Sequence, residues 1–256
     1  MKSMRQKGTK ILVSFFTALT LAGGMALAAG QANDSTEAVK NRVVEKFKQS
    51  GLLVGNDIQV AVENKTITLA GTVRNLALKE QAGREALSVA KGFKLANNIA
   101  LAAADVSPQQ IADAVMAAVE KSPSYFIFDY VGVSVTGDGA VTLKGWTTYP
   151  WSVTDLVKLA QAQPGVQKVK DEVRRILSVD ADQALRLAVA RLIYTRPKTS
   201  SFSRMNGPVH ILVNNGVVTL GGTVDREADV DGFERLVRFN TNAVNVVNAL
   251  QVRKKE

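Results

Sequence analysis

One pattern of alternating apolar and polar residues is written three times in this chain, and it limits the possible folds more than any other feature. The copies read IQVAVENKTITLAGTV from Ile58, VGVSVTGDGAVTLKGWT from Val131 and VHILVNNGVVTLGGTV from Val209. Such alternation predicts strands with one buried face, and the central Asn or Gly residues predict a tight turn between two strands. The glycine near the end of each copy recurs at nearly even spacing. This recurrence indicates three small tandem domains instead of one large core.

A second constant is the spacing between that glycine and a later polar residue. The interval is the same in all three copies, and the pairs are Gly71 and Asn97, Gly145 and Asp171, and Gly222 and Asn248. A glycine inside a strand is expected where a missing Cβ is needed, here to let the following helix dock closely. The polar residue falls on the apolar side of a third strand and needs a hydrogen-bond partner, which we expect to be a turn backbone. Both sets are therefore interpreted as structural.

Each hairpin is flanked by segments with helical periodicity. In the first unit, Ser35 is expected to cap a helix that runs through Gln49, after a flexible lead-in over residues 29–35. A second helix follows each repeated glycine, and a third strand closes each unit. A three-stranded mixed sheet has one face for a core, so both helices are expected to cover that face. The sequence therefore predicts an α+β fold of three tandem αββαβ domains, over residues 35–103, 107–177 and 180–253.

Residues 1–28 are predicted to lie outside these domains. A basic start is followed by an apolar run that closes on Ala26-Leu27-Ala28, a small-x-small pattern suited to signal peptidase. We therefore expect a signal peptide over residues 1–28, cleaved near Ala28, and Sec-dependent export. The run approaches the length of a membrane span, so an uncleaved anchor is the alternative. The chain has no cysteine, which excludes disulfides and lipoprotein attachment.

Charge narrows the classes of partner. The formal net charge is +9, and without the four cations of the leader it is about +5. This excess is mild and spread along the chain, unlike the dense basic stripe of a nucleic-acid-binding protein, so no nucleic acid is expected as a partner. It fits either a solvated surface with a cationic bias or a weak preference for anionic surfaces.

Patterns for catalysis or metal binding are scarce. The single histidine, His210, falls on the polar side of a strand and is interpreted as an exposed residue. A Gly-x-Ser-x-Gly elbow and the His or Cys spacings of metal sites are absent. Acidic pairs such as Asp229 with Asp231, or Asp171 with Glu172, are interpreted as surface residues. We expect no enzyme, no cofactor and no metal, and an enzyme that uses an acidic pair is a remote alternative.

The closing strand completes a recognisable pattern, which in the second unit reads Val166-x-x-Val169-x-Asp171-x-Val173. Together with the hairpin pattern V-x-V-x-x-G-x-V-T-L-x-G-x-V, it resembles the BON domain, named for bacterial osmotically induced and nodulation proteins. The resemblance covers almost all of residues 35–253. It implies an αββαβ fold, a periplasmic location and a non-enzymatic role at phospholipid membranes or other envelope components, in support of envelope integrity under osmotic stress. The osmotically induced periplasmic proteins carry two such units, so the third copy is a departure, and no ligand residues carry over.

Two sets of residues exceed what the fold needs. Trp146, Tyr149 and Trp151 crowd the second unit and suit a bilayer headgroup region or a protein groove, although they could equally fill a gap between adjoining domains. A cation near an anionic leaflet contributes about 1 kcal/mol, although lysines also protect an exposed strand from edge pairing. The candidate cations are Lys168, Lys170 and Arg174 on one strand face, and Arg196, Lys198 and Arg204 in a long polar loop.

These residues lead to the hypothesis of an exported binding protein that associates weakly with anionic phospholipid headgroups. The aromatic loop and the basic strand face of the second unit are its expected contacts. The alternative is a chaperone-like or scaffolding protein that binds other envelope proteins.

Overall fold

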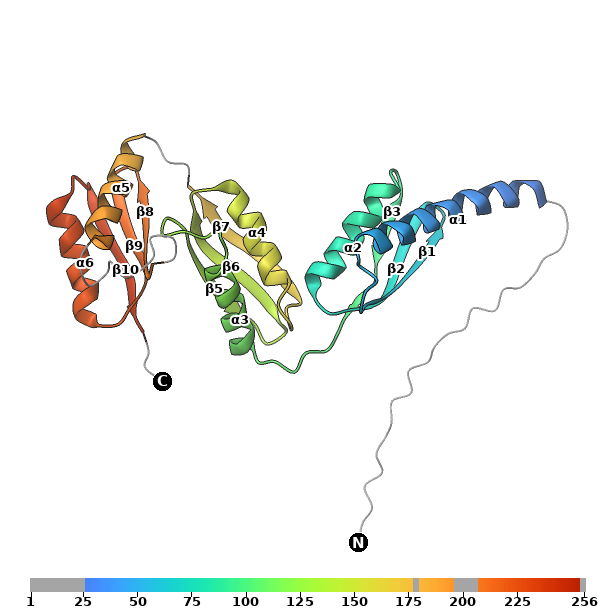
Figure 1. The fold of residues 1–256 in the computed structure, drawn as a ribbon, viewed down its shortest axis with the longest axis horizontal. Helices are drawn as coiled ribbons and strands as arrows, with labels where there is room; N and C mark the ends of the chain where they lie inside the picture. Colours follow the sequence, from blue (N-terminus) through green and yellow to red (C-terminus); the bar gives the residue numbers. More distant parts are fainter. Residues whose placement is uncertain (1–25, 177–179, 196–206, 254–256) are drawn as a thin grey trace, which may run out of the picture.

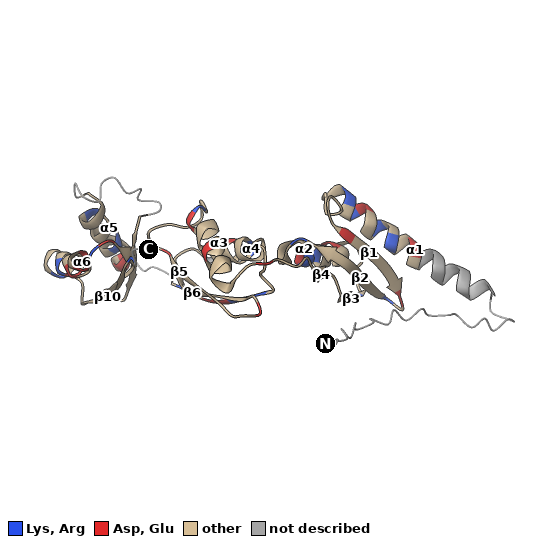
Figure 2. Ribbon diagram, turned by 90° about the horizontal axis from the view of Figure 1, so that it is seen from below, with Lys and Arg blue, Asp and Glu red and all other residues tan. Residues whose placement is uncertain are grey.

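The computed structural model of the chain describes residues 26–176, 180–195 and 207–253. Three domains of similar shape lie in a row along the long axis of the molecule (Figures 1 and 2). Each folds as a helix, a hairpin, a second helix and a parallel strand, so the predicted α+β fold of three αββαβ units is confirmed. The predicted signal peptide falls largely on residues 1–25, which lie outside the described residues.

The first domain begins with a longer helix than predicted. Helix α1 (Ala26–Gln49) already includes residues 29–35, so the predicted flexible lead-in and the predicted cap at Ser35 are wrong. The residues before Ser35 are rich in alanine, whose high helix propensity favours continuing the helix. The other elements are β1 (Asp57–Glu63), β2 (Thr66–Val73), α2 (Leu76–Val89), β3 (Lys94–Asn97) and β4 (Ala100–Leu101).

The second and third domains repeat this order with one closing strand each. Ser107 opens the second domain with a capping box, in which its hydroxyl accepts from the Gln110 amide at 3.2 Å. The elements of the second domain are α3 (Pro108–Glu120), β5 (Tyr130–Val135), β6 (Ala140–Thr147), α4 (Pro150–Gln161) and β7 (Lys168–Arg175). Those of the third are α5 (Asp180–Tyr194), β8 (Val209–Asn214), β9 (Val217–Val224), α6 (Glu227–Asn240) and β10 (Asn245–Val252).

The sheet register explains the constant interval between the repeated glycine and the repeated polar residue. In each domain two strands form an antiparallel hairpin, and the closing strand pairs parallel to the second of them. The repeated polar residue always lies opposite a leucine that stands shortly before the repeated glycine in the second strand. These pairs are Asn97 with Leu69, Asp171 with Leu143 and Asn248 with Leu220. All three domains therefore keep both the same register and the same interval, although the connecting helices α2, α4 and α6 have 14, 12 and 14 residues.

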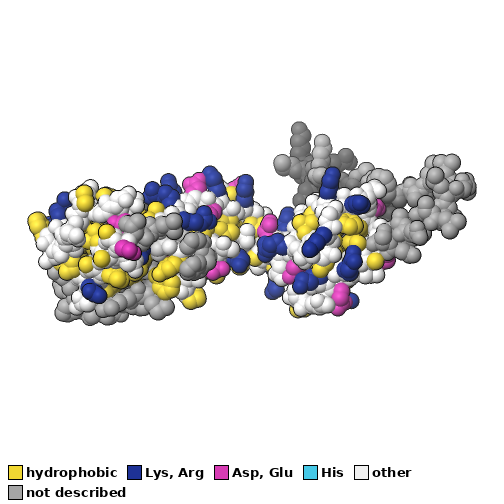
Figure 3. Space-filling model, turned by 90° about the horizontal axis from the view of Figure 1, so that it is seen from above, with side chains coloured by type: hydrophobic (Ala, Val, Ile, Leu, Met, Phe, Trp, Pro, Cys, Tyr) yellow, Lys and Arg dark blue, Asp and Glu magenta, His cyan; other side chains and the backbone are white. Residues whose placement is uncertain are grey.

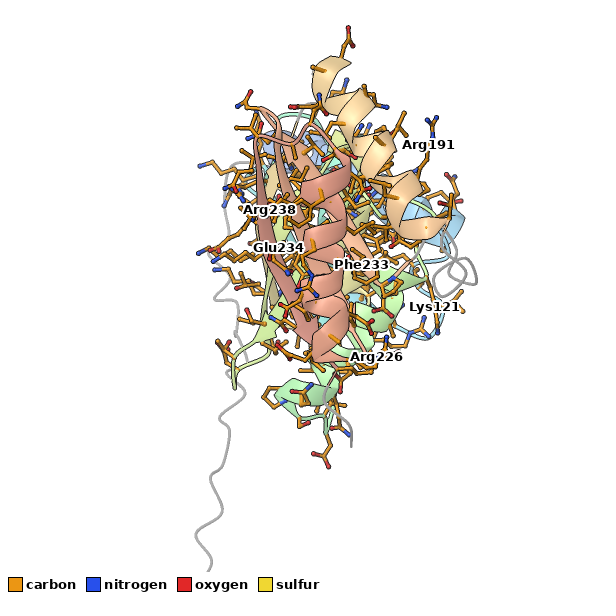
Figure 4. The ribbon with its side chains drawn as sticks, turned by 90° about the vertical axis from the view of Figure 1, so that its left-hand side faces the viewer. Lys121, Arg191, Arg226, Phe233, Glu234 and Arg238 are labelled. Atoms are coloured by element: carbon orange, nitrogen blue, oxygen red, sulfur yellow. The ribbon has the colours of Figure 1, made fainter. Side chains whose placement is uncertain are left out.

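The helices of each domain pack on one face of its sheet, as Figure 4 shows for α5 and α6. The core of each domain lies between that face and the helices. Two residues belong to the core of the next domain: Leu76 of α2 packs in the second core, and Ile127 packs in the third. We call the opposite side of a sheet its outer face. On the second domain it carries Tyr130, Gly132, Lys144, Trp146 and Arg174.

Candidate interaction surfaces

The repeated glycines are required by a close approach within each hairpin. Gly71, Gly145 and Gly222 have φ angles of +105°, +148° and +111°. A Cβ on any of them would overlap a backbone carbonyl oxygen of the neighbouring antiparallel chain, and these carbonyls belong to Asp57, Tyr130 and Pro208. The glycines therefore serve the fold, as predicted. The predicted reason is wrong, because the neighbouring strand and not the following helix leaves no room for a side chain.

The repeated asparagines connect the closing strand to the second helix. Asn97 donates from Nδ2 to the carbonyl oxygen of Lys79 in α2 at 2.8 Å. Asn248 makes the same bond to the carbonyl oxygen of Val230 in α6 at 2.9 Å. The expected partner was a turn backbone, and a helix carbonyl takes its place. The bond satisfies a polar side chain between strand and helix and fixes the helix along the sheet.

Asp171 occupies the same position in the second domain but lacks the bond to the helix, although it shares with Asn97 and Asn248 the bond from the amide two residues later. Its carboxylate has no N–H to offer a helix carbonyl, and it accepts from the Val173 amide at 2.9 Å. In the third domain the network is larger, because Glu234 is a second acceptor for Asn248 at 3.3 Å. Glu234 also pairs with Arg238 at 2.7 Å on the surface of α6 (Figure 4).

Trp146, predicted as a lipid or partner contact, is buried between the second and third domains. It is 6% exposed, and its ring lies on that of Tyr130 with 5.0 Å between centroids. Gly221 of β9 faces this pair, and a Cβ there would lie 2.9 Å from the Trp146 ring and 3.4 Å from that of Tyr130. Glycine at 221 thus makes room for the tryptophan. This placement matches the alternative in which the aromatics fill a gap between adjoining domains, and it leaves Trp146 unavailable to a bilayer.

The segment from Ser122 to Asp129, which we call the aromatic segment, joins the second domain to the third. Ile127 is 3% exposed and packs within the third core. Its carbonyl oxygen accepts from the amide of Ile211 in β8 at 2.7 Å. Because β8 is the outermost strand of its sheet, this bond covers an edge that would otherwise be open to pairing.

A buried carboxylate holds the aromatic segment in place. Asp129 is fully buried and accepts from the Thr147 hydroxyl at 2.7 Å, the Thr148 amide at 2.9 Å and the Phe126 amide at 3.1 Å. These bonds, with a longer one from the Thr148 hydroxyl at 3.5 Å, make the burial of this charge tolerable. They come from the segment itself and from the end of β6, so Asp129 ties the two together.

His210, interpreted from the sequence as an exposed strand residue, is only 8% exposed at the same junction. It lies on the outer face of β8, but the second domain covers that face. Its ring centroid is 5.2 Å from that of Tyr125 and 5.6 Å from that of Tyr130. Burial lowers the pKa of His210 below its ordinary 6.5, and the backbone carbonyls of Asp129 and Phe126 oppose this shift.

The predicted cations of β7 are placed as expected. Lys168, Lys170 and Arg174 are all exposed, and Arg174 lies opposite Trp146 in the sheet register. Trp146 and these three cations therefore share one outer face. Lys170 pairs with Glu172 at 2.6 Å, which raises the pKa of Lys170 and offsets one positive charge.

The remaining predicted contacts are only partly described. Tyr149 is 39% exposed, and the Phe126 ring meets it edge-on at 6.4 Å. The side chain of Trp151 lies outside the described part of the chain, as do Arg196, Lys198 and Arg204.

Three lysines that the sequence reasoning missed gather at one end of the first domain, which we call the lysine end. Lys65 occupies the β1–β2 turn with a φ of +57°, and its carbonyl oxygen accepts from the Lys94 amide at 2.8 Å. Lys91 lies in the neighbouring turn between α2 and β3. Leu87, in the last turn of α2, is 40% exposed. Seen from above in Figure 3, the first domain carries Lys and Arg side chains around a hydrophobic patch.

A charge count by domain would have favoured the first domain. Residues 35–103 contain ten Lys and Arg against six Asp and Glu, whereas residues 107–177 contain seven of each. The aromatic residues instead favour the second domain, which carries no net charge over residues 107–177.

Within the described ranges, no group of three or more His, Cys, Asp or Glu residues is placed to hold a metal ion. None of the helices in that part of the chain combines the length and the apolar run needed to cross a bilayer.

The chain was compared with solved structures, curated proteins and family profiles. CdsD, a structural protein of the type III secretion system of Chlamydia trachomatis, is 18% identical with a TM-score of 0.25, over 84% of this chain and 92% of that chain. The periplasmic domain of PrgH is 15% identical with a TM-score of 0.22, over 80% and 99%. No curated protein matches the chain. The family profile of the BON domain matches three times, at residues 35–103, 107–175 and 201–254. The chain therefore belongs to the BON domain family and contains three BON domains in tandem.

Proposed function

We propose that the chain is an exported, non-enzymatic envelope protein that associates weakly with anionic phospholipid surfaces through the lysine end of its first domain. BON domains are associated with membrane and phospholipid binding and are generally non-catalytic. Export to the periplasm is inferred from the leader over residues 1–28. A part in envelope integrity under osmotic stress is inferred from the family resemblance.

The observation that carries the proposal is the position of Lys65 and Lys91 on adjacent turns and of Lys94 at the start of β3, with the exposed Leu87 in the last turn of α2. A cation near an anionic leaflet contributes about 1 kcal/mol, so three give about 3 kcal/mol. Leu87 adds the burial of a partly exposed side chain at the acyl boundary. Together these contributions support reversible docking and not permanent anchoring.

The cationic face of β7 is the weaker candidate for the same surface. Lys170 is paired with Glu172, and Trp146, the apolar anchor expected beside these cations, is buried against the third domain. This face therefore offers charge without an exposed apolar group, and it provides a matched comparison for the lysine end.

Co-sedimentation of the full chain with phosphatidylcholine vesicles, with and without phosphatidylglycerol, tests the proposal. We expect binding only to the anionic vesicles, weakened by added salt because exposed charges are screened. The triple variant Lys65→Gln, Lys91→Gln, Lys94→Gln should bind on the order of 100-fold more weakly.

The matched control is the triple variant Lys168→Gln, Lys170→Gln, Arg174→Gln, which removes the same number of cations and should bind nearly as well as the parent chain. Equal binding to neutral and anionic vesicles would contradict the proposal. A larger loss in the control than in the lysine-end variant would contradict it as well.

A further inference from the structure

The outer face of the second domain carries more positive than negative charge. Every second residue of β6 and β7 lies on this face, and four of these residues are cations, namely Lys144, Lys168, Lys170 and Arg174. Glu172 lies among them and pairs with Lys170 at 2.6 Å, and Asp138 in the β5–β6 turn interacts with Lys168. With both carboxylates counted, two cations remain in excess.

The third domain covers part of this face without supplying a counter-charge. In β8, β9 and β10 every second residue lies on the outer face, from His210 to Asn214, from Val217 to Thr223 and from Asn245 to Gln251. None of these outer-face residues is Asp, Glu, Lys or Arg. The junction between the two domains therefore uses the aromatic rings of the second domain but leaves its excess cations without a partner charge on the covering face.

The contact between the two outer faces is imperfectly packed. Trp146 Nε1 and His210 Nδ1 are buried without a hydrogen-bond partner among the described residues. A buried polar group without a partner destabilises the arrangement that buries it. A hollow of about 520 Å³ lies on one side of the contact, lined by Lys144 and Trp146, and a space of about 340 Å³ separates Arg174 from parts of β8 and β9.

The aromatic segment holds the two domains together more firmly. Ile127 is packed in the third core, and its carbonyl oxygen accepts from the Ile211 amide at 2.7 Å. Both the side chain and the backbone of Ile127 are therefore fixed to the third domain. The outer faces can separate while this segment keeps the domains joined and serves as the hinge.

Separation of the faces would uncover side chains that suit the headgroup region of a bilayer. Trp146 and Tyr130 form a ring pair on the second sheet, and Arg174 lies opposite Trp146 in the neighbouring strand. Trp and Tyr favour the level of the headgroups, and Lys and Arg favour an anionic leaflet. A face that combines both rings with an excess of cations therefore matches an anionic phospholipid surface.

We propose that the outer face of the second domain is a second contact for anionic phospholipid bilayers, and that the third domain is a cover that keeps its aromatic rings from the bilayer. This inference rests on the proposed function, because both take the same kind of surface as the partner. In the closed state the cations act without the rings, and the lysine end makes the main contact. Separation of the two outer faces adds Trp146 and Tyr130 to the cations.

A side chain at Gly221 tests the cover. A Cβ there would lie 2.9 Å from the Trp146 ring, and Gly221 does not have the positive φ of Gly222. Gly221→Gln should therefore push the two faces apart without straining its own strand. The equivalent position carries Lys144 in the second domain, so this fold accepts a long polar side chain there. Ala70→Gln, at the equivalent position of the first domain, is the matched control.

Both substitutions are placed in the full chain that already carries Lys65→Gln, Lys91→Gln and Lys94→Gln, so that the lysine end does not contribute. With vesicles that contain phosphatidylglycerol, Gly221→Gln should bind at least about tenfold more tightly than this background, because two rings gain a place in the bilayer. Ala70→Gln should change nothing. Adding Trp146→Ala, or the set Lys144→Gln, Lys168→Gln and Arg174→Gln, should abolish the gain.

The position of Trp146 in the bilayer is measured by fluorescence quenching with brominated acyl chains. Trp151→Phe leaves Trp146 as the single tryptophan, because the chain has two. Its emission should be quenched in bound Gly221→Gln and not in bound Ala70→Gln. His210→Ala removes the ring contacts with Tyr125 and Tyr130 without adding bulk, and it should give smaller changes of the same kind. Slow exchange of the Ile211 amide shows in each variant that the third domain is folded, and His210→Ala decides the test if Gly221→Gln does not fold.

The proposal is overturned if a folded Gly221→Gln or His210→Ala chain binds no more tightly than Ala70→Gln, if the gain survives Trp146→Ala, or if Trp146 stays unquenched in the bound open variants. The proposed function is tested separately by the parent chain. Parent binding that depends on the lysine end, together with no gain from Gly221→Gln, would remove the cover alone. Absence of parent binding to anionic vesicles would remove the proposed function.

Discussion

The amide of Ile211 donates to the carbonyl oxygen of Ile127 at 2.7 Å, and the Ile127 side chain fills the core of a domain to which it does not belong in sequence. The second BON domain therefore completes the third. This junction extends over the outer faces of both sheets. The second domain contributes Trp146 and Tyr130, and the third contributes Gly221 and His210.

Truncating Ile127 should destabilise the third domain although the residue lies in the second. Removing a buried isoleucine side chain to alanine costs about 2–5 kcal/mol. We expect Ile127→Ala to lower the midpoint of the urea transition that includes the third domain, followed by fluorescence because Trp146 lies at the junction. Val244→Ala, at a residue 79% exposed in the third domain, should change the midpoint little. An equal midpoint for Ile127→Ala and the parent chain would show that Ile127 does not complete the core.

Two glycines of the third domain should respond to alanine in opposite directions. Gly222 has a φ of +111°, and a Cβ there would overlap the Pro208 carbonyl oxygen, so Gly222→Ala should destabilise by about 2 kcal/mol or more. Gly232 lies inside α6 with open space around it, so Gly232→Ala should stabilise by about 0.5–1 kcal/mol. Thermal unfolding of both variants measures the difference. A stabilising Gly222→Ala would argue against the close approach.

Asn248→Asp should show that the repeated amide, and not merely a polar group, is needed. The carboxylate keeps an acceptor for the Leu250 amide but loses the N–H that reaches the Val230 carbonyl. It also places a second negative charge beside Glu234. We expect a loss of about 1–3 kcal/mol in denaturant unfolding. Asn242→Asp, at an exposed loop position, is the control and should be nearly neutral; similar losses in both variants would contradict the role of the helix bond.

The junction between the second and third domains should weaken in mild acid. Burial lowers the pKa of His210 below its ordinary 6.5, so the unfolded chain binds more protons than the folded chain as the pH falls below that value. The contribution of His210 to the free energy of unfolding is therefore complete above about pH 6.5, and it decreases as the pH falls through the lowered pKa. The titratable side chains around the ring are Tyr125, Tyr130 and Asp129.

The measurement is the melting temperature between about pH 7.5 and about pH 5, in the parent chain and in His210→Phe. The variant keeps an aromatic ring against the two tyrosines and removes the titration, so its curve should be flatter over this range. Parallel curves for both proteins would exclude His210 as the cause.

The repeat architecture could be predicted from the sequence because it depends on local pattern. Alternation sets which residues of a strand face the helices, and the distance from Gly71 to Asn97 reflects a register that all three domains keep. The reason for the glycine could not be predicted, because a positive φ and a clash with the Asp57 carbonyl appear only when two strands are paired.

The candidate contacts were harder to predict, since they depend on what covers an outer face. Trp146 and His210 both lie on the polar side of their strands, which in a single repeat means solvent, and another repeat buries them both. One signal was present: Gly221 stands where the other copies have Ala70 and Lys144. Gly221 has no side chain on the outer face of its sheet, and the preceding repeat carries Trp146 on its own outer face. Together the two residues indicate a contact between these faces.

Native-state hydrogen exchange at the Ile211 amide tests the junction between the second and third domains most directly. If Ile127 covers the edge of β8, this amide should exchange as slowly as amides inside the sheet of the third domain, and Ile127→Ala should speed it up. Exchange of the Ile211 amide in the parent chain at the rate of an exposed loop amide would contradict the junction.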